Sequence, residues 1–207
     1  MISKSEKLSR ITEIALEKGK IYGETVNSFA KYAIDHNDWN DVDYLIKDDP
    51  LCFFYVMKLC LKYGYLSKFQ KYFNIIDFKN TSGYVEYLII CCIRYGRFKQ
   101  LKLIYEKYKQ QIDFSYNEFA IFKATASSKS VDIYKYMRDI LKNNAKKEIN
   151  SACEHVINYI SNNKRISIEN LLVIIEFNSY NESFKNYVKF IINLKYAIKA
   201  DFLYGGV

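Results

Sequence analysis

The chain has 207 residues, half of them hydrophobic, and a formal net charge of +8. This length is enough for one sizeable core and is compatible with one or two domains. One proline and seven glycines are few for a β-sandwich or an α/β enzyme of this size, so the composition favours helices joined by short polar turns.

The first twenty residues are charged throughout and contain no apolar stretch, so they do not read as a secretory signal. They predict a helix at about residues 5–20. The longest apolar run, Tyr87 to Ile93, is too short to span a bilayer. The five cysteines have no CxxC spacing and fit free buried thiols in a reducing compartment. We therefore expect an intracellular, cytoplasmic protein without a membrane segment.

Five similar ten-residue segments follow, and their starts are separated by 27, 32, 33 and 35 residues. They are NDWNDVDYLI from Asn37, GYLSKFQKYF from Gly64, GRFKQLKLIY from Gly96, KSVDIYKYMR from Lys129 and KRISIENLLV from Lys164. Their third and ninth positions are always apolar, and the sixth is apolar except at Glu169. Because these positions share one side of a helix, each segment predicts an amphipathic helix after a short turn.

A second helix is predicted before each of these segments. The residues seven positions before each start are Ala30, Met57, Ile89, Phe122 and Ile157, and those four positions before it are Ala33, Cys60, Cys92, Thr125 and Ile160. The three-residue step keeps both columns on one face, and the nearer column is mostly small, as expected where two helices pack closely.

The turn between the two helices begins at the first residue of each segment. Asn37, Gly64 and Gly96 suit the left-handed conformation that ends many helices, whereas Lys129 and Lys164 suit it less well. We therefore expect left-handed residues at the first three turns only.

The final segment, at about residues 180–203, predicts one more amphipathic helix. It could cap the last repeat, and the N-terminal helix could cap the first. The predicted fold class is all-α: a helical-repeat solenoid of helix-turn-helix units of about 33 residues, with about five repeats in residues 25–175 of a single domain, 1–207. An irregular helical bundle is the alternative.

The segments GYLSKFQKYF, GRFKQLKLIY and KSVDIYKYMR resemble the second half of an ankyrin repeat, over roughly residues 25–175. Ala33, Cys60 and Cys92 fall where such repeats place a helix-packing alanine. The Thr-Pro-Leu-His turn and the Gly-Ala-Asp finger are absent, and only Ile-Asp-Phe, at 76–78 and 112–114, takes the place of the finger. Such eroded, Tyr-, Ile-, Asn- and Lys-rich repeats resemble ankyrin-like proteins of large DNA viruses. Tetratricopeptide and HEAT repeats are alternatives.

Groups that catalyse reactions or bind metals do not converge in the sequence. Cys153 and His155, two residues apart, point in different directions on a helix. The aspartates of residues 35–43 lack the glycine and closing glutamate of a calcium loop, and no phosphate-binding loop motif occurs. We expect no enzymatic activity, no metal and no cofactor.

The basic residues are concentrated in the middle of the chain. Residues 51–110 carry eleven Lys/Arg against three Asp/Glu. In an ankyrin-like register the end of each first helix lines the concave surface, so we expect Lys62, Tyr63, Arg94, Tyr95 and Arg97 to bind a partner. Tyr and Arg are enriched at protein interfaces.

The predicted function is a non-enzymatic macromolecular-interaction module, a viral protein that binds and sequesters or inhibits a host protein with an acidic surface. A binder of single-stranded RNA or DNA is one alternative, because basic side chains can hold phosphates and tyrosine rings can stack on nucleobases. A structural component of a viral particle is another. No oligomeric state is predicted.

Overall fold

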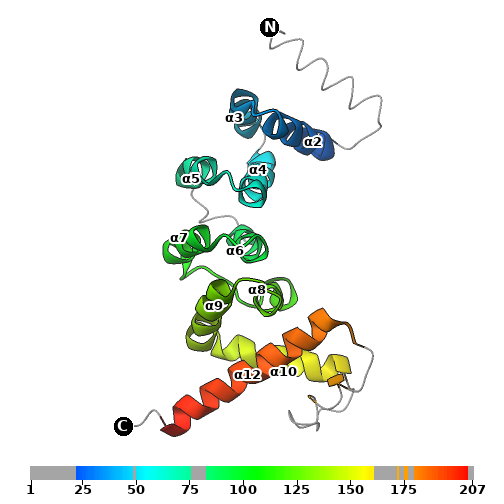
Figure 1. Cartoon of the computed structure of the whole chain (residues 1–207), viewed down its shortest axis with the longest axis vertical. Coiled ribbons are helices and arrows are strands. Elements are labelled where there is room, and N and C mark those ends of the chain that lie inside the picture. Colours follow the sequence, from blue (N-terminus) through cyan, green and yellow to red (C-terminus); the bar gives the residue numbers. More distant parts are fainter. Residues whose placement is uncertain are drawn as a thin grey trace. The chain divides into compact units, whose positions relative to one another are not determined.

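The computed structural model describes residues 22–48, 50–75, 83–160, 172, 175–176 and 180–204, which form helices and turns and contain no strand (Figure 1). The all-α prediction is confirmed. The helix predicted at about residues 5–20 lies outside the described residues. The chain divides into two compact units, residues 1–77 (unit 1) and 78–207 (unit 2). The single solenoid domain stays a prediction.

Unit 1 contains two helical pairs. The helices α2 (Tyr22–Asp35) and α3 (Trp39–Asp48) form the first pair, and α4 (Pro50–Tyr63) and α5 (Leu66–Ile75) form the second. Helix α4 packs against α2, α3 and α5, and its sequence, PLCFFYVMKLCLKY, is apolar on almost every side, as this central position requires.

Unit 2 begins with two further pairs, α6 (Tyr84–Arg94) with α7 (Phe98–Tyr108) and α8 (Tyr116–Ala126) with α9 (Val131–Asn144). Helix α10 (Lys146–Ile160) follows. The helix predicted at about residues 180–203 is present as α12 (Glu182–Tyr204), which packs across α8, α9 and α10 (Figure 1). The segment predicted from Lys164 lies almost wholly outside the described residues.

Most of the columns that the sequence predicts lie in the core, together with many further apolar residues of the same helices. The sixth and ninth positions of the first three segments are buried, and so are the two columns of the preceding helices in the first four units. The third position differs, because Trp39, Leu66 and Phe98 are only half-buried and Val131 is 64% exposed. This position lies next to the turn, where the neighbouring helix no longer covers it.

Three of the turns share one backbone geometry. Asn37, Gly64 and Gly96 have φ values of 58°, 82° and 69°, as predicted. The next residue in each case donates its N–H to the carbonyl five residues earlier, at 2.8–2.9 Å. This is the bond of a Schellman-type helix end, which satisfies a carbonyl that the helix leaves open.

The fourth turn is built differently. Lys129 is not left-handed, and the side chain of Ser130 instead accepts the N–H of Ile133 at 3.4 Å. Serine at this position begins a helix by satisfying one of its first donors. The sequence change from glycine to lysine thus accompanies a change in how the turn is stabilised.

The beginnings of α6 and α8 are joined by buried contacts. Glu86 in the first turn of α6 is 3% exposed and accepts the backbone N–H of Asp113 at 2.7 Å. Gly83, with φ of 85°, lies so close to the ring of Tyr116 that a Cβ added there would stand 2.6 Å from the nearest ring carbon. These contacts fix the segment that connects α7 to α8.

Three consecutive residues at the start of α8 are left-handed. Asn117, Glu118 and Phe119 have φ values of 46°, 53° and 62°. Such a conformation costs a non-glycine residue about 1–2 kcal/mol. Phe119 is buried and its ring packs edge-on against Phe122 at 5.9 Å, so burial of this ring offsets part of the strain.

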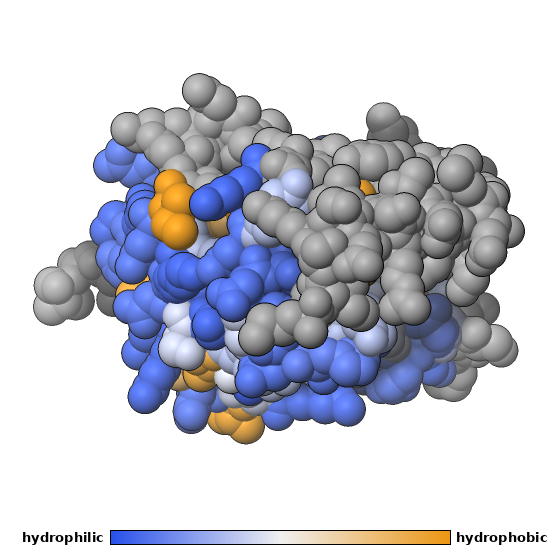
Figure 2. All heavy atoms as spheres, turned by 90° about the horizontal axis from the view of Figure 1, so that it is seen from above, coloured by the Kyte–Doolittle hydropathy of each residue, from blue (hydrophilic) through white to orange (hydrophobic). Residues whose placement is uncertain are grey.

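Hydrophilic residues dominate the face of the molecule drawn in Figure 2, and the hydrophobic residues form small separate groups. Large exposed apolar side chains such as Ile75, Leu103 and Val131 are scattered over α5, α7 and α9. Among the described residues, no helix combines the length and apolar character that crossing a bilayer requires.

Candidate interaction surface

Lys62 and Tyr63, two of the predicted binding residues, are the last residues of α4. Both are exposed, and the Lys62 ammonium lies 5.2 Å from the centre of the Tyr63 ring. A cation over an aromatic face is attracted by the ring quadrupole. The structure thus presents a paired charge and ring at this end of unit 1.

Arg94, Tyr95 and Arg97 surround the turn between α6 and α7 in unit 2. Arg94 is exposed, whereas Tyr95 and Arg97 are half-buried. The backbone N–H of Arg97 is used by the turn itself, in its bond to Cys92 at 2.8 Å. Arg94 is therefore the residue of this group whose side chain is most open to a partner.

These two groups of residues belong to different units. Each unit is described by itself, so the adjacency of Lys62 and Tyr63 with Arg94 and Arg97 stays a prediction.

Two further lysines, Lys31 and Lys58, were not predicted from the sequence. Counted back from the turn, the position two residues before it holds Asp35 in α2, Lys62 in α4 and Arg94 in α6, and all three are exposed. The position six residues before it holds the exposed Lys31 in α2, the half-buried Lys58 in α4 and the buried Ile90 in α6. The signal was available, because these positions lie opposite the buried columns on a helix.

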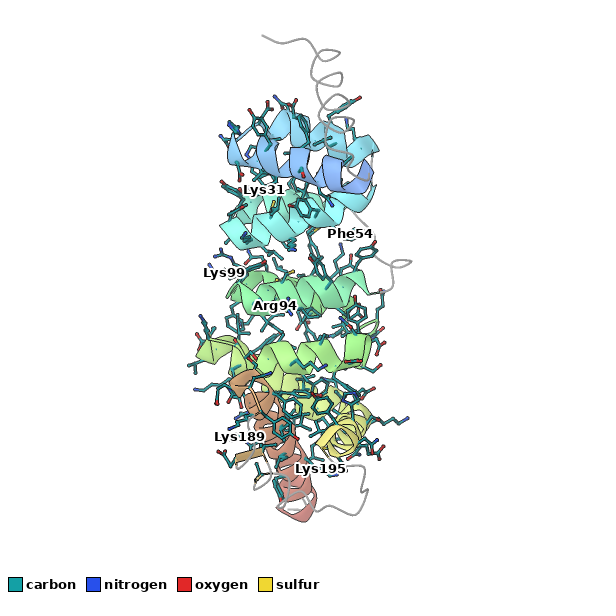
Figure 3. All side chains as sticks on the ribbon, turned by 90° about the vertical axis from the view of Figure 1, so that its right-hand side faces the viewer. Lys31, Phe54, Arg94, Lys99, Lys189 and Lys195 are labelled. Atoms are coloured by element: carbon teal, nitrogen blue, oxygen red, sulfur yellow. The ribbon has the colours of Figure 1, made fainter. Side chains whose placement is uncertain are left out.

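We call the exposed side of the first helices of unit 1 the α2–α4 surface. Its residues are Ser28, Lys31, Asp35, His36, Tyr55, Lys58, Lys62 and Tyr63. Figure 3 looks onto α2 and α4, with Lys31 labelled. Half of these residues carry a charge, and α4 itself contains no aspartate or glutamate.

Lys31 lies at the centre of the electrostatics of this surface. Its ammonium donates a hydrogen bond to the Asp35 carboxylate at 2.6 Å. This bond and the carboxylate charge raise the pKa of Lys31, and Tyr63 and Tyr55 on the neighbouring helix act in the same direction. The lysine of α2 therefore lies close to two tyrosines of α4.

The second helices of unit 1 carry a different cluster. Asp43 accepts hydrogen bonds from Lys71 at 2.7 Å and from the Tyr72 hydroxyl at 2.9 Å. Partial burial tends to raise the pKa of Asp43, but these two hydrogen bonds outweigh it, so the pKa lies below the ordinary value. Trp39 lies beside this group with the Lys68 ammonium 4.8 Å from its ring centre. These contacts tie α3 to α5.

An aromatic cluster with one lysine joins α7 to α9 in unit 2. The rings of Phe98 and Tyr136 meet edge-on at 5.4 Å, and Tyr105 contacts Tyr136 at 6.1 Å. Lys102 lies 4.3 Å from the centre of the Phe98 ring. These three rings are half-buried, so the cluster holds the two helices together and leaves little aromatic surface open.

The cysteines, histidines and acidic residues do not converge on a metal-binding group in the described part of the chain. No three or more of these side chains are placed there to hold a metal ion. All five cysteines are free and buried, and burial raises the pKa of Cys60 to about 12 and that of Cys153 to about 11. His155 is exposed and contacts Phe119 at 6.0 Å, away from the environment of the buried Cys153 thiol.

Comparison of the chain with protein-family models, with curated proteins and with solved structures gives no match.

Proposed function

We propose that the protein is a non-enzymatic interaction module built from degenerate ankyrin-like helical repeats, and that it binds a protein partner with an acidic surface. We further propose that its role is that of the ankyrin-like proteins of large DNA viruses that it resembles, and that it sequesters or inhibits a host protein. No cofactor or metal takes part.

The repeated turn supports the repeat. Asn37, Gly64 and Gly96 end three first helices in the same conformation. In each case the residue that follows donates its N–H to the carbonyl five residues before it. Equivalent positions before these turns are buried in the same columns. A shared local geometry that recurs after 27 and 32 residues is typical of repeat units of about 30 residues.

The links between the helical pairs do not favour a full ankyrin unit. Helix α9 ends at Asn144 and α10 begins at Lys146, which leaves only Ala145 between them. The described link at 109–115 contains turns and no strand. We therefore propose helix pairs without hairpin fingers, at least at these two links.

The observation that carries the proposed function is that basic residues recur at equivalent positions near the ends of the first helices. The position two residues before the turn holds Lys62 and Arg94 after Asp35 in α2, and the position six residues before it holds Lys31 and Lys58, followed by the buried Ile90 in α6. The exposed residues among those described in α4 and α6 are Lys62, Tyr63 and Arg94. Within each unit, these cations favour carboxylates by charge complementarity.

The proposal is tested by capturing partners from a host-cell lysate with three proteins: the wild type, Lys58→Glu/Lys62→Glu, and Lys146→Glu/Lys147→Glu. The third carries the same charge change on exposed positions of α10. We expect the wild type and the α10 variant to retain one discrete protein and the α4 variant to lose it. Equal retention by all three would contradict the proposed surface.

The nucleic-acid alternative is tested beside it with a labelled single-stranded oligothymidylate. Binding that weakens steeply with salt, by the release of counterions from several phosphates, would favour that alternative. We expect no such binding.

A further inference from the structure

We propose that the α2–α4 surface binds a side-chain carboxylate of an acidic protein segment, and that Asp35 is the chain's own carboxylate in competition for the same cations. This inference rests on the proposed function and names the chemical group that the surface recognises.

The first support is the geometry of the pair. The Lys31 ammonium binds the Asp35 carboxylate at 2.6 Å, and the two side chains are 47% and 39% exposed. An exposed pair of this kind contributes little to stability, about 0–1 kcal/mol. Its carboxylate is therefore exchangeable for another one at little cost to the fold.

The second support is the set of donors around the pair. Helices α2 and α4 pack directly together, and the described residues of α4 that are not buried are Tyr55, Lys58, Lys62 and Tyr63. In agreement with this packing, Tyr63 and Tyr55 act on the pKa of Lys31 in the same direction as Asp35. Ammonium groups and tyrosine hydroxyls donate the charge-assisted hydrogen bonds that carboxylates accept.

The third support is the sign of the charge at equivalent positions. Asp35 occupies the position that holds Lys62 in α4 and Arg94 in α6. It is an acid where the next two first helices have a base, and it binds the lysine one turn earlier. Asp35 thus places a carboxylate on this surface at the position where the next two first helices carry a cation.

The charge balance of unit 1 favours a local carboxylate contact over a nucleic-acid strand. Its described residues contain six Lys/Arg and six Asp/Glu, so they supply no net positive charge along the length of a nucleic-acid strand, whereas the lysines of the α2–α4 surface can attract single carboxylates.

The exposed rings of this surface are also already in contact on one face. Tyr63 has Lys62 over its ring, and the centre of the His36 ring lies 4.0 Å from that of Tyr32, a residue of α2 outside the defined surface. Stacking of successive bases requires open ring faces. A protein segment bearing Asp or Glu is the occupant that these contacts fit.

The test measures binding of a labelled Glu/Leu-rich peptide, and of the same peptide with Gln in place of Glu, to the full chain at low salt by fluorescence anisotropy. We expect the Glu peptide to bind and the Gln peptide to fail. Asp35→Asn should tighten binding about two- to five-fold, because it releases Lys31, and Lys31→Met should weaken it by a similar factor.

The control is Asp43→Asn, which makes the same change of net charge on α3, where Asp43 binds Lys71 and Tyr72. It should leave the affinity within error of the wild type. Equal tightening by Asp35→Asn and Asp43→Asn would overturn the inference, since only the total charge would then matter, and the proposed function would survive.

Two other outcomes also overturn the inference. Failure of the Glu peptide to bind removes the carboxylate site, whatever protein the lysate experiment retains. Stronger binding of oligothymidylate than of the Glu peptide removes both this inference and the proposed function.

Discussion

The close approach of Gly83 to Tyr116 makes a sharp prediction about stability. Gly83 and Gly96 both have positive φ, 85° and 69°, so alanine at either position adopts a strained backbone. That strain costs about 1–2 kcal/mol. The two sites differ in the room that they leave for a side chain. A Cβ at Gly96 meets nothing within 4 Å, whereas one at Gly83 stands 2.6 Å from a carbon of the Tyr116 ring.

We therefore expect Gly96→Ala to destabilise the protein by about 1–2 kcal/mol, the strain alone. Gly83→Ala should cost about 1–3 kcal/mol more, the typical effect of an overpacked contact. The measurement is urea unfolding followed by far-ultraviolet circular dichroism, and Gly96→Ala is the matched control within the same unit.

A double-mutant cycle with Tyr116→Ala isolates the contact. With the ring removed, Gly83→Ala should cost no more than Gly96→Ala, which gives a coupling energy of about 1–3 kcal/mol between the two positions. Equal costs for the two glycine variants in the presence of Tyr116, together with a coupling near zero, would refute the reasoning. The ring would then move aside freely.

Three further predictions concern burial, backbone strain and pH. The buried hydroxyl of Tyr187 has no hydrogen-bond partner among the described residues. Tyr187→Phe should therefore leave the free energy of unfolding, measured in urea, unchanged or raise it by about 1 kcal/mol. A decrease of about 1 kcal/mol would contradict this prediction. Glu118→Gly should raise the free energy of unfolding by about 1 kcal/mol, because glycine adopts the left-handed start of α8 without strain. The control Glu154→Gly, on the exposed side of α10, should lower it by about as much. If both variants lowered the free energy of unfolding, the result would count against the observed φ values. Because the pKa of Asp43 is lowered in the folded state, its contribution to stability is present at pH values above the ordinary pKa of 3.8 and is lost as the pH falls through the lowered pKa. Asp43→Asn should therefore reduce the loss of stability that the protein shows in acid. An unchanged loss in acid would show that other groups cause it.

Most of the described helices and part of the core could be predicted from the sequence because periodic apolar residues leave few alternatives. Val42, Phe69 and Leu101 fall at one repeated position, and each is fully buried. The turns at Gly64 and Gly96 followed from the conformational freedom of glycine.

The rest depends on contacts between distant residues, which local patterns do not encode. Asparagine tolerates a left-handed backbone, but Glu118 and Phe119 give no local signal for one, and the burial of Phe119 is a tertiary contact. Of the candidate surface, Lys62 and Tyr63 could be found from the position of the turn. Their relation to Lys31 requires knowledge of how α2 and α4 pack.

The burial of every cysteine gives the protein a practical property. Cys52, Cys60, Cys91, Cys92 and Cys153 are all free and shielded from solvent. Since a thiol reacts as the exposed thiolate, the native chain should be silent towards maleimide reagents. A single cysteine introduced by Lys62→Cys would then be the only site to accept a photocrosslinker, and any protein that it captured would have been touching the end of α4.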